Sequence, residues 1–215
     1  MIVESASKVL PMFVTRRFAL LGAAGLLLSA CVGASFKTDY DPLPASTSGS
    51  WRLADVRVTV PRSLSVSEAK TLLPDADIVW REDPMGDRHA QVAAIIDAAV
   101  TRGAQGLRGK RPVRIDVTVT RFHALTFEAE TRGQNWGVHN VDFIAQVTDA
   151  ATGEVLVPPS PIRAELPALA GQEMRQARQR GITQKSMITD HVARTVAGWL
   201  GIGPDNRGEF NRQGN

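Results

Sequence analysis

The stretch from Pro112 to His123 constrains the fold more than any other part of the chain, because its side chains alternate between apolar and polar. Four apolar side chains fall on one side of this stretch: Val113, Ile115, Val117 and Val119. Arginine, aspartate and threonine fall on the other side. A period of two puts every second side chain on the same face, so this stretch is predicted to be a half-buried strand that needs a covering layer.

The same alternation recurs elsewhere and predicts further strands. The predicted strands are Trp51–Pro61, the short piece Asp77–Arg81, Val138–Thr148 and Glu154–Val157. The segment 149–153 is typical of a hairpin turn. Leu125–Glu130 either extends the strand before it or forms a separate one. The prolines at 158, 159 and 161 predict that no long central strand continues there, although 162–166 could form an edge piece.

Two segments change the period to that of a helix. From Asp87 to Ala104, apolar residues recur at i, i+3, i+4, i+7 and i+8: Val92, Ile95, Ile96, Ala99 and Val100. A second apolar stripe runs from Ile188 to Leu200, and Gly201 ends it. The preceding segment, 172–184, is so polar that it is expected to be a separate solvated piece broken near Gly181.

The order of these elements predicts an α+β fold. Runs of adjacent strands favour hairpins, so we expect a mainly antiparallel sheet with two amphipathic helices on one face. This single α+β domain is expected over residues 51–204. Before it, residues 31–50 are small, polar and proline-containing, and are predicted to be a flexible tether. The polar residues 205–215 are predicted to be a disordered tail.

The N-terminus has the layout of an export signal over residues 1–30. Arg16 and Arg17 precede an apolar run, Phe18–Leu28, of about 11 residues, which is too short to span a bilayer. The run ends in Leu-Ser-Ala-Cys at 28–31, which resembles the lipobox of bacterial lipoproteins. This resemblance implies cleavage between Ala30 and Cys31 and lipid attached to the thiol of Cys31. The alternative is an ordinary signal peptide with a coincidental cysteine.

The details of export stay open. Residues 15–20 partly match a twin-arginine signal, but Ala19 stands where that pattern has an aromatic, so the general export route is preferred. Either Met1 or Met12 can be the true start. Val32 is not the aspartate that resembles an inner-membrane retention signal, and this favours the periplasmic side of the outer membrane over the inner membrane.

The charge balance argues against nucleic acid as a partner. The whole chain has a formal net charge of +3, and removing residues 1–30 takes away three basic side chains and one acidic one. The mature chain is therefore close to neutral, whereas nucleic-acid binding needs clustered positive charge. Cys31 is the only cysteine, so the fold must hold without a disulfide.

No catalytic motif is recognised. There is no nucleophile elbow, no phosphate-binding loop and no dinucleotide-binding fingerprint after a strand. The histidines have no spacing typical of metal ligands; His123 and His139 could approach each other near Glu128 and Glu130, but zinc sites need three or four converging ligands. We therefore predict no catalytic residues, no metal and no cofactor, and we regard an enzyme as unsupported.

The segment around Trp136 is the main candidate for partner binding. Trp136 stands among His139, Asn140 and other polar residues, and an exposed tryptophan is a typical binding anchor. The competing interpretation is that Trp136 folds back to cap the sheet, since tryptophan is usually largely buried.

Lipobox, tether and compact domain together resemble the small envelope lipoproteins of Gram-negative bacteria in domain-of-unknown-function families. More distantly, the layout is similar to auxiliary lipoproteins of transport systems. These resemblances imply a membrane-anchored periplasmic lipoprotein that binds an envelope protein or lipid as a non-catalytic binding or adaptor module. The alternative is a periplasmic enzyme with an unrecognised site.

Overall fold

The computed structural model of the protein describes residues 35–132 and 137–211. The predicted signal peptide and Cys31 lie outside these residues. The elements in chain order are β1 (Ser35–Asp39), α2 (Ala45–Ser48), β2 (Trp51–Thr59), β3 (Ile78–Val79), α3 (Arg88–Gly103), a 3₁₀ turn (Ala104–Gly106), β4 (Arg111–His123), α4 (Phe127–Arg132), β5 (Val138–Asp149), β6 (Val155–Ala164), β7 (Leu166–Pro167), α5 (Gly171–Gln179), α6 (Gln184–Trp199) and β8 (Gly208–Asn211).

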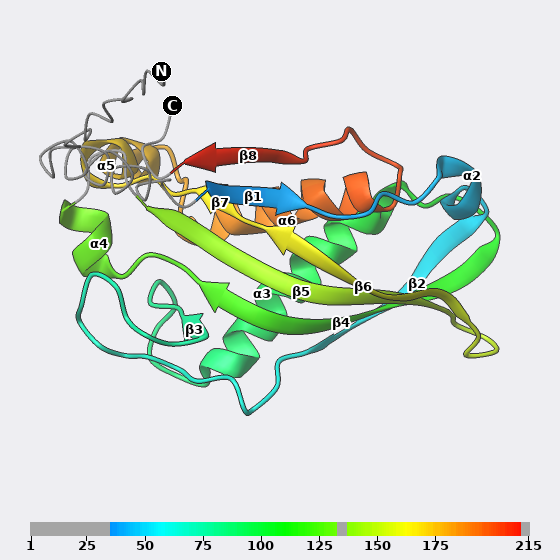
Figure 1. Cartoon of the computed structure of the whole chain (residues 1–215), viewed down its shortest axis with the longest axis horizontal. Helices are drawn as coiled ribbons and strands as arrows, with labels where there is room; N and C mark the ends of the chain where they lie inside the picture. Colours follow the sequence, from blue (N-terminus) through cyan, green and yellow to red (C-terminus); the bar gives the residue numbers. More distant parts are fainter. Residues whose placement is uncertain (1–34, 133–136, 212–215) are drawn as a thin grey trace, which may run out of the picture. The chain divides into compact units, whose positions relative to one another are not determined.

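One mixed sheet organises these elements. Its strand order is β2-β4-β5-β6-β1-β8, with β3 beside β4 and β7 beside β5. Most neighbours are antiparallel, which confirms the α+β prediction, but β4 runs parallel to both β2 and β3. A parallel pair needs a crossover connection, and α3 lies in the connection between β2 and β4 (Figure 1).

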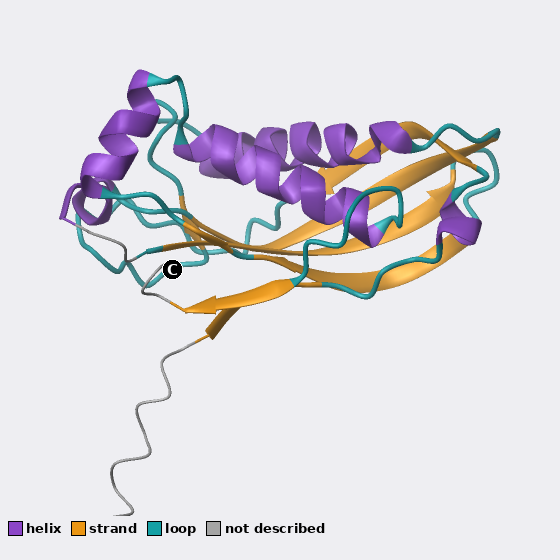
Figure 2. Ribbon diagram, turned by 90° about the horizontal axis from the view of Figure 1, so that it is seen from above, coloured by secondary structure: helices purple, strands orange, loops and turns teal. Residues whose placement is uncertain are grey.

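The two long helices α3 and α6 cover one face of the sheet (Figure 2). The inward side chains of β4 and β5 are fully buried beneath them, as the alternation predicted. The helices pack closely at Gly103, where an added Cβ would lie 2.5 Å from the Ala193 carbonyl oxygen. None of the described helices is long and apolar enough to cross a membrane.

The predicted tether is wrong from residue 35 onward. Residues 35–39 form β1, which pairs with both β6 and β8, and 45–48 form α2. Tyr40 is only 3% exposed, and its hydroxyl lies 3.0 Å from Asp205 Oδ1. Proline and small residues suggested a linker, but a short strand between two others needs little local apolar pattern, because its partners supply the hydrogen bonds.

The predicted disordered tail is wrong over residues 208–211, which form β8. Phe210 lies opposite Phe36 of β1, and their ring centroids are 5.9 Å apart. The folded domain is therefore longer at both ends than the predicted 51–204.

Two further local predictions are corrected. The 125–130 segment is not a strand, because Thr126 Oγ1 accepts from Ala129 N at 3.1 Å and starts α4. Strand β6 runs through Pro158, Pro159 and Pro161, which was not expected. The first two prolines fall at a shift in register against β5, and β1 pairs only with the last residues of β6, so the prolines interrupt few ladder bonds.

Candidate binding pocket

A cavity of about 150 Å³ lies where the end of β4, the start of β5, α4 and the loop before β3 meet. Most of its wall is apolar: Phe36, Leu72, Leu73, Ala124, Leu125, Ala129, Gly137 and Val138. Three polar side chains complete the wall: Arg121, His123 and Asn140. The cavity is therefore an apolar recess with one hydrogen-bonding edge, which is the usual make-up of a ligand site.

Hydrogen bonds of Thr126 hold the apolar wall together. Its hydroxyl donates to the Thr71 carbonyl at 2.8 Å and accepts from Ala129 N. This joins the 71–73 loop to the first turn of α4. Buried Leu125 and Ala129 pack with Leu72 in a small cluster that is separate from the main core.

An ion-pair network fixes α4 on its other side. Arg178 of α5 reaches Glu130 Oε2 at 2.8 Å and Glu82 Oε1 at 2.8 Å. Glu130 also accepts from the Gln184 side chain at the start of α6. Arg178, which was expected in a solvated segment, thus joins α5 to α4 and to the loop at Glu82, while Glu130 joins α4 to α6.

The polar edge is built by the outward side chains of β4 and β5. Arg121 Nη2 donates to His123 Nδ1 at 3.1 Å, and His123 lies opposite Asn140 across the two strands. Burial and the nearby Arg121 charge lower the pKa of His123 to about 4, so its ring is neutral at pH 7. Asn140 Nδ2 in turn donates to Glu165 Oε1 at 2.8 Å.

A row of alternating charges crosses four strands beside this edge. Strand register places Arg121 opposite Asp142, Asp142 opposite Arg163, and Arg163 opposite Asp39. Burial and the nearby Glu165 carboxylate raise the pKa of Asp142 to about 6, although both arginines act in the other direction.

Three buried polar atoms of this region have no hydrogen-bond partner among the described residues: Arg121 Nε, Asn140 Oδ1 and Asp142 Oδ1. Buried polar groups in folded proteins are nearly always paired. Two of the side chains that carry these atoms, Arg121 and Asn140, line the cavity.

The residues predicted for partner binding are placed differently from one another. Asn140 lines the cavity. His139 points to the opposite face of β5, is fully buried and leaves no surface for a partner. Trp136, like Ala30 and Cys31, lies outside the described residues. His123 and His139 face opposite sides of the sheet, and the described residues contain no group of three or more metal-ligating side chains that could hold a metal ion.

Arg121 and His123 of the polar edge, and Asp142 beside it, were not predicted as binding residues from the sequence. The signal was present as polar outward positions at the ends of two predicted strands. Whether these polar side chains lie next to one another depends on the strand register. β4 shifts its register against β5 between Val119 and Arg121. Periodicity alone does not show such a shift.

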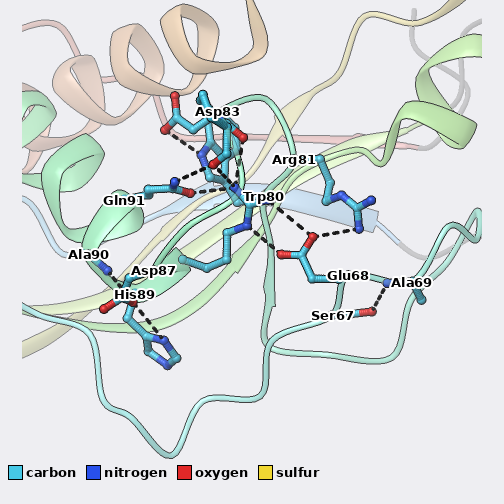
Figure 3. Close-up of polar contacts among 12 residues, drawn as sticks. Ser67, Glu68, Ala69, Trp80, Arg81, Asp83, Asp87, His89, Ala90 and Gln91 are labelled. Atoms are coloured by element: carbon cyan, nitrogen blue, oxygen red, sulfur yellow. Dashed lines mark hydrogen bonds and ion pairs between the residues drawn. The ribbon is translucent and has the colours of Figure 1, made fainter.

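A second polar cluster surrounds Arg88, which is 5% exposed, and Figure 3 shows its neighbours from the loop before α3. Its guanidinium donates to Glu68 Oε1 at 2.7 Å, to Gln91 Oε1 at 2.7 Å and to the Asp83 carbonyl at 3.0 Å. Trp80 Nε1 also donates to Asp83 at 2.8 Å. Because each guanidinium nitrogen has a protein acceptor, this cluster holds the loop to α3 and is complete without a ligand.

Comparisons with solved structures give distant similarities. The PelC dodecamer from Paraburkholderia phytofirmans has 12% identity, covers 78% of this chain and 99% of its own, and has a TM-score of 0.34. Protein XCC0632 from Xanthomonas campestris has 14% identity, covers 75% of this chain and 89% of its own, and has a TM-score of 0.43. No curated protein matches the sequence. One family model matches most of the chain, residues 51–215, and the protein therefore belongs to the family of unknown function DUF6778.

Proposed function

We propose that the protein is a lipid-anchored, non-catalytic binding or adaptor module of the bacterial cell envelope, on the periplasmic side and with the outer membrane favoured over the inner. The anchor rests on the sequence Leu-Ser-Ala-Cys at 28–31, preceded by an apolar run and two arginines. Diacyl modification of Cys31 would hold the chain stably, since two acyl chains anchor where one is marginal.

The single observation that carries the binding role is the cavity beside α4. Its volume of about 150 Å³ is close to that of an engineered apolar cavity that binds benzene. It therefore suits an apolar group of about six carbons, such as an aromatic or leucine side chain of a protein partner or a short acyl segment. Arg121 and Asn140 at its edge would orient a polar group attached to the occupant.

The alternative, a periplasmic enzyme, has one observation in its favour: neutral His123 in the wall, with Asp142 on the neighbouring strand. However, none of the described wall residues carries a carboxylate, hydroxyl or thiol. Acid–base or nucleophilic chemistry needs such groups within reach of the substrate. Binding is therefore the better account of this cavity.

The anchor is tested by metabolic labelling in cells. The wild-type protein should take up labelled palmitate and fractionate with membranes, and Cys31→Ser should do neither. A Cys31→Ser protein that is still labelled and still membrane-bound would refute the anchor. Separation of inner and outer membranes then checks the expected location.

The pocket is tested by titration with hexanol and hexanoate, followed by amide NMR. We expect saturable shifts at Val138 and Asn140 in the wild type and their loss in Ala129→Phe, which fills the cavity. The control is Ile144→Phe, further along β5 and 37% exposed, which should bind as the wild type does. Equal shifts in both variants would show that the cavity is not the site.

A further inference from the structure

The topology brings the pocket and the entry of the chain to one end of the sheet. Strand β1 runs in the same direction as β5, because both are antiparallel to β6. The first residue of β1, Ser35, pairs with Asn211 of β8. Figure 1 shows α4, the start of β1 and the tip of β8 at one end, and the β5–β6 hairpin at the other.

Apolar side chains gather at this end. Leu73 is 65% exposed on the rim of the pocket, although most leucine side chains of the domain lie in or against its core. Phe36 lines the pocket and stacks on Phe210. Apolar surface next to an apolar recess favours contact with an apolar partner, because the contact removes that surface from water.

The short length of chain between Cys31 and β1 indicates that this apolar partner is the lipid bilayer. Three residues separate Cys31 from Ser35, and the four steps from one Cα to the other can span at most about 14 Å. The 12 residues of β5 extend over roughly 36 Å, so the β5–β6 hairpin lies far from the point where the chain enters. A lipid on Cys31 would therefore hold the pocket end, and not the hairpin end, at the bilayer.

The lipid on Cys31 is itself a poor occupant of the pocket. A cavity of this size holds about six carbons, which is less than half of a palmitoyl chain. The methylenes that do not fit would stay in water, which is unfavourable. The acyl chains of the anchor consequently stay in the bilayer. The apolar rim of the pocket then contacts the bilayer and not the anchor's own acyl chains.

We propose that the rim of the pocket at Leu73 and Phe36, together with Phe210 stacked on Phe36, is the surface with which the domain contacts the lipid bilayer. This proposal rests on the lipid anchor proposed above and adds an orientation: the end with α4 lies on the membrane and the β5–β6 hairpin points away from it. Exposed Lys70 and Asp75 flank Leu73 with opposite charges, so the contact is apolar and not electrostatic.

The test uses the full-length acylated protein in phosphatidylethanolamine–phosphatidylglycerol vesicles. Once its only cysteine carries lipid, Leu73→Cys provides a single free thiol for an environment-sensitive fluorophore. The matched control is Val155→Cys at the other end, where the native side chain is 52% exposed. Quenching by spin-labelled lipids should be at least about threefold stronger at position 73, and it should persist in about 0.5 M salt, where surface charges are screened.

The outcomes separate the two proposals. Protein that floats with the vesicles but shows equal quenching at both positions, or none, overturns the orientation and leaves the anchor intact. Quenching at position 73 that is lost in high salt overturns the apolar contact. Protein whose Cys31 carries no lipid by mass spectrometry overturns the anchor and the orientation together.

Discussion

At the scale of single residues, two ionisable side chains change the stability of the protein with pH in opposite directions. His139 is fully buried, neither ring nitrogen has a partner among the described residues, and burial lowers its pKa to about 3. Asp142 is partly buried and its pKa is raised to about 6. Burial favours the neutral form of each side chain, by lowering the pKa of His139 and by raising the pKa of Asp142.

Replacing His139 should make the protein less sensitive to acid. The unfolded chain protonates this histidine near pH 6.5 and the folded chain only near pH 3, so stability is lost as pH falls between these values. We expect His139→Leu to be about as stable as the wild type at pH 7.5 and more stable by about 2 kcal/mol at pH 4.5. Urea unfolding at the two pH values checks this. An unchanged difference between variant and wild type would contradict it.

Replacing Asp142 should show the reverse dependence. The folded chain binds this proton near pH 6 and the unfolded chain near pH 4, so ionisation lowers stability as pH rises through this window. Allowing for solvent screening, we expect Asp142→Asn to gain about 1 kcal/mol at pH 8 and nothing at pH 3.5. Thermal unfolding across this range is the measurement. A gain that does not vary with pH would rule out burial of the ionised carboxylate as its cause.

At the scale of elements, the packing of α3 on α6 depends on the absence of a side chain at Gly103. A Cβ there would lie 2.9 Å from the Val196 Cβ as well as against the Ala193 carbonyl. Alanine would raise helix propensity by up to about 1 kcal/mol, but overpacking a helix contact costs about 1–3 kcal/mol. The cost of overpacking the contact between α3 and α6 is therefore larger than the gain in helix propensity.

Gly103→Ala should therefore destabilise the protein by about 1–2 kcal/mol. The control is Asp97→Ala on the exposed side of α3, which should change stability by less than about 0.5 kcal/mol. Denaturant midpoints of the two variants give the comparison. A stabilised Gly103→Ala protein would mean that the two helices separate easily.

Elements with a strong repeating pattern could be predicted, whereas others could not. The inward residues of β4 and β5 and the apolar stripes of α3 and α6 indicated these elements to within a few residues. The helix α4 was missed because a single side chain, Thr126, starts it. Strands β1 and β8 were missed because they are short and are stabilised by pairing with each other. The pocket lies next to these missed elements, so its wall could not be assembled from the sequence.

At the scale of the whole molecule, strand order joins the two ends of the chain. β1 lies between β6 and β8 in the sheet, so the first and last described strands are neighbours. Periodicity predicts which segments are strands but carries no information about such order, and neither strand was predicted to belong to the domain. Residues that were predicted to be a tether and a disordered tail thus form two strands of the sheet.

Removing β8 should weaken the fold although it comprises only four residues. A chain ending at Asn206 loses the β1–β8 ladder and the Phe36–Phe210 contact, and we expect it to lose about 1–2 kcal/mol. A chain ending at Asn211 keeps both and is the control. Urea unfolding distinguishes them, and equal stability would show that β8 contributes nothing.

The place of β1 between β6 and β8 also determines the order in which the chain can fold. β1 precedes both of its partners in the chain, so one of its edges waits for residues 155–164 and the other for residues 208–211. Such distant pairings must close large loops and slow the final step of folding. The sheet is incomplete until these pairs form, and any factor that shields unpaired strands would act on the chain before that step.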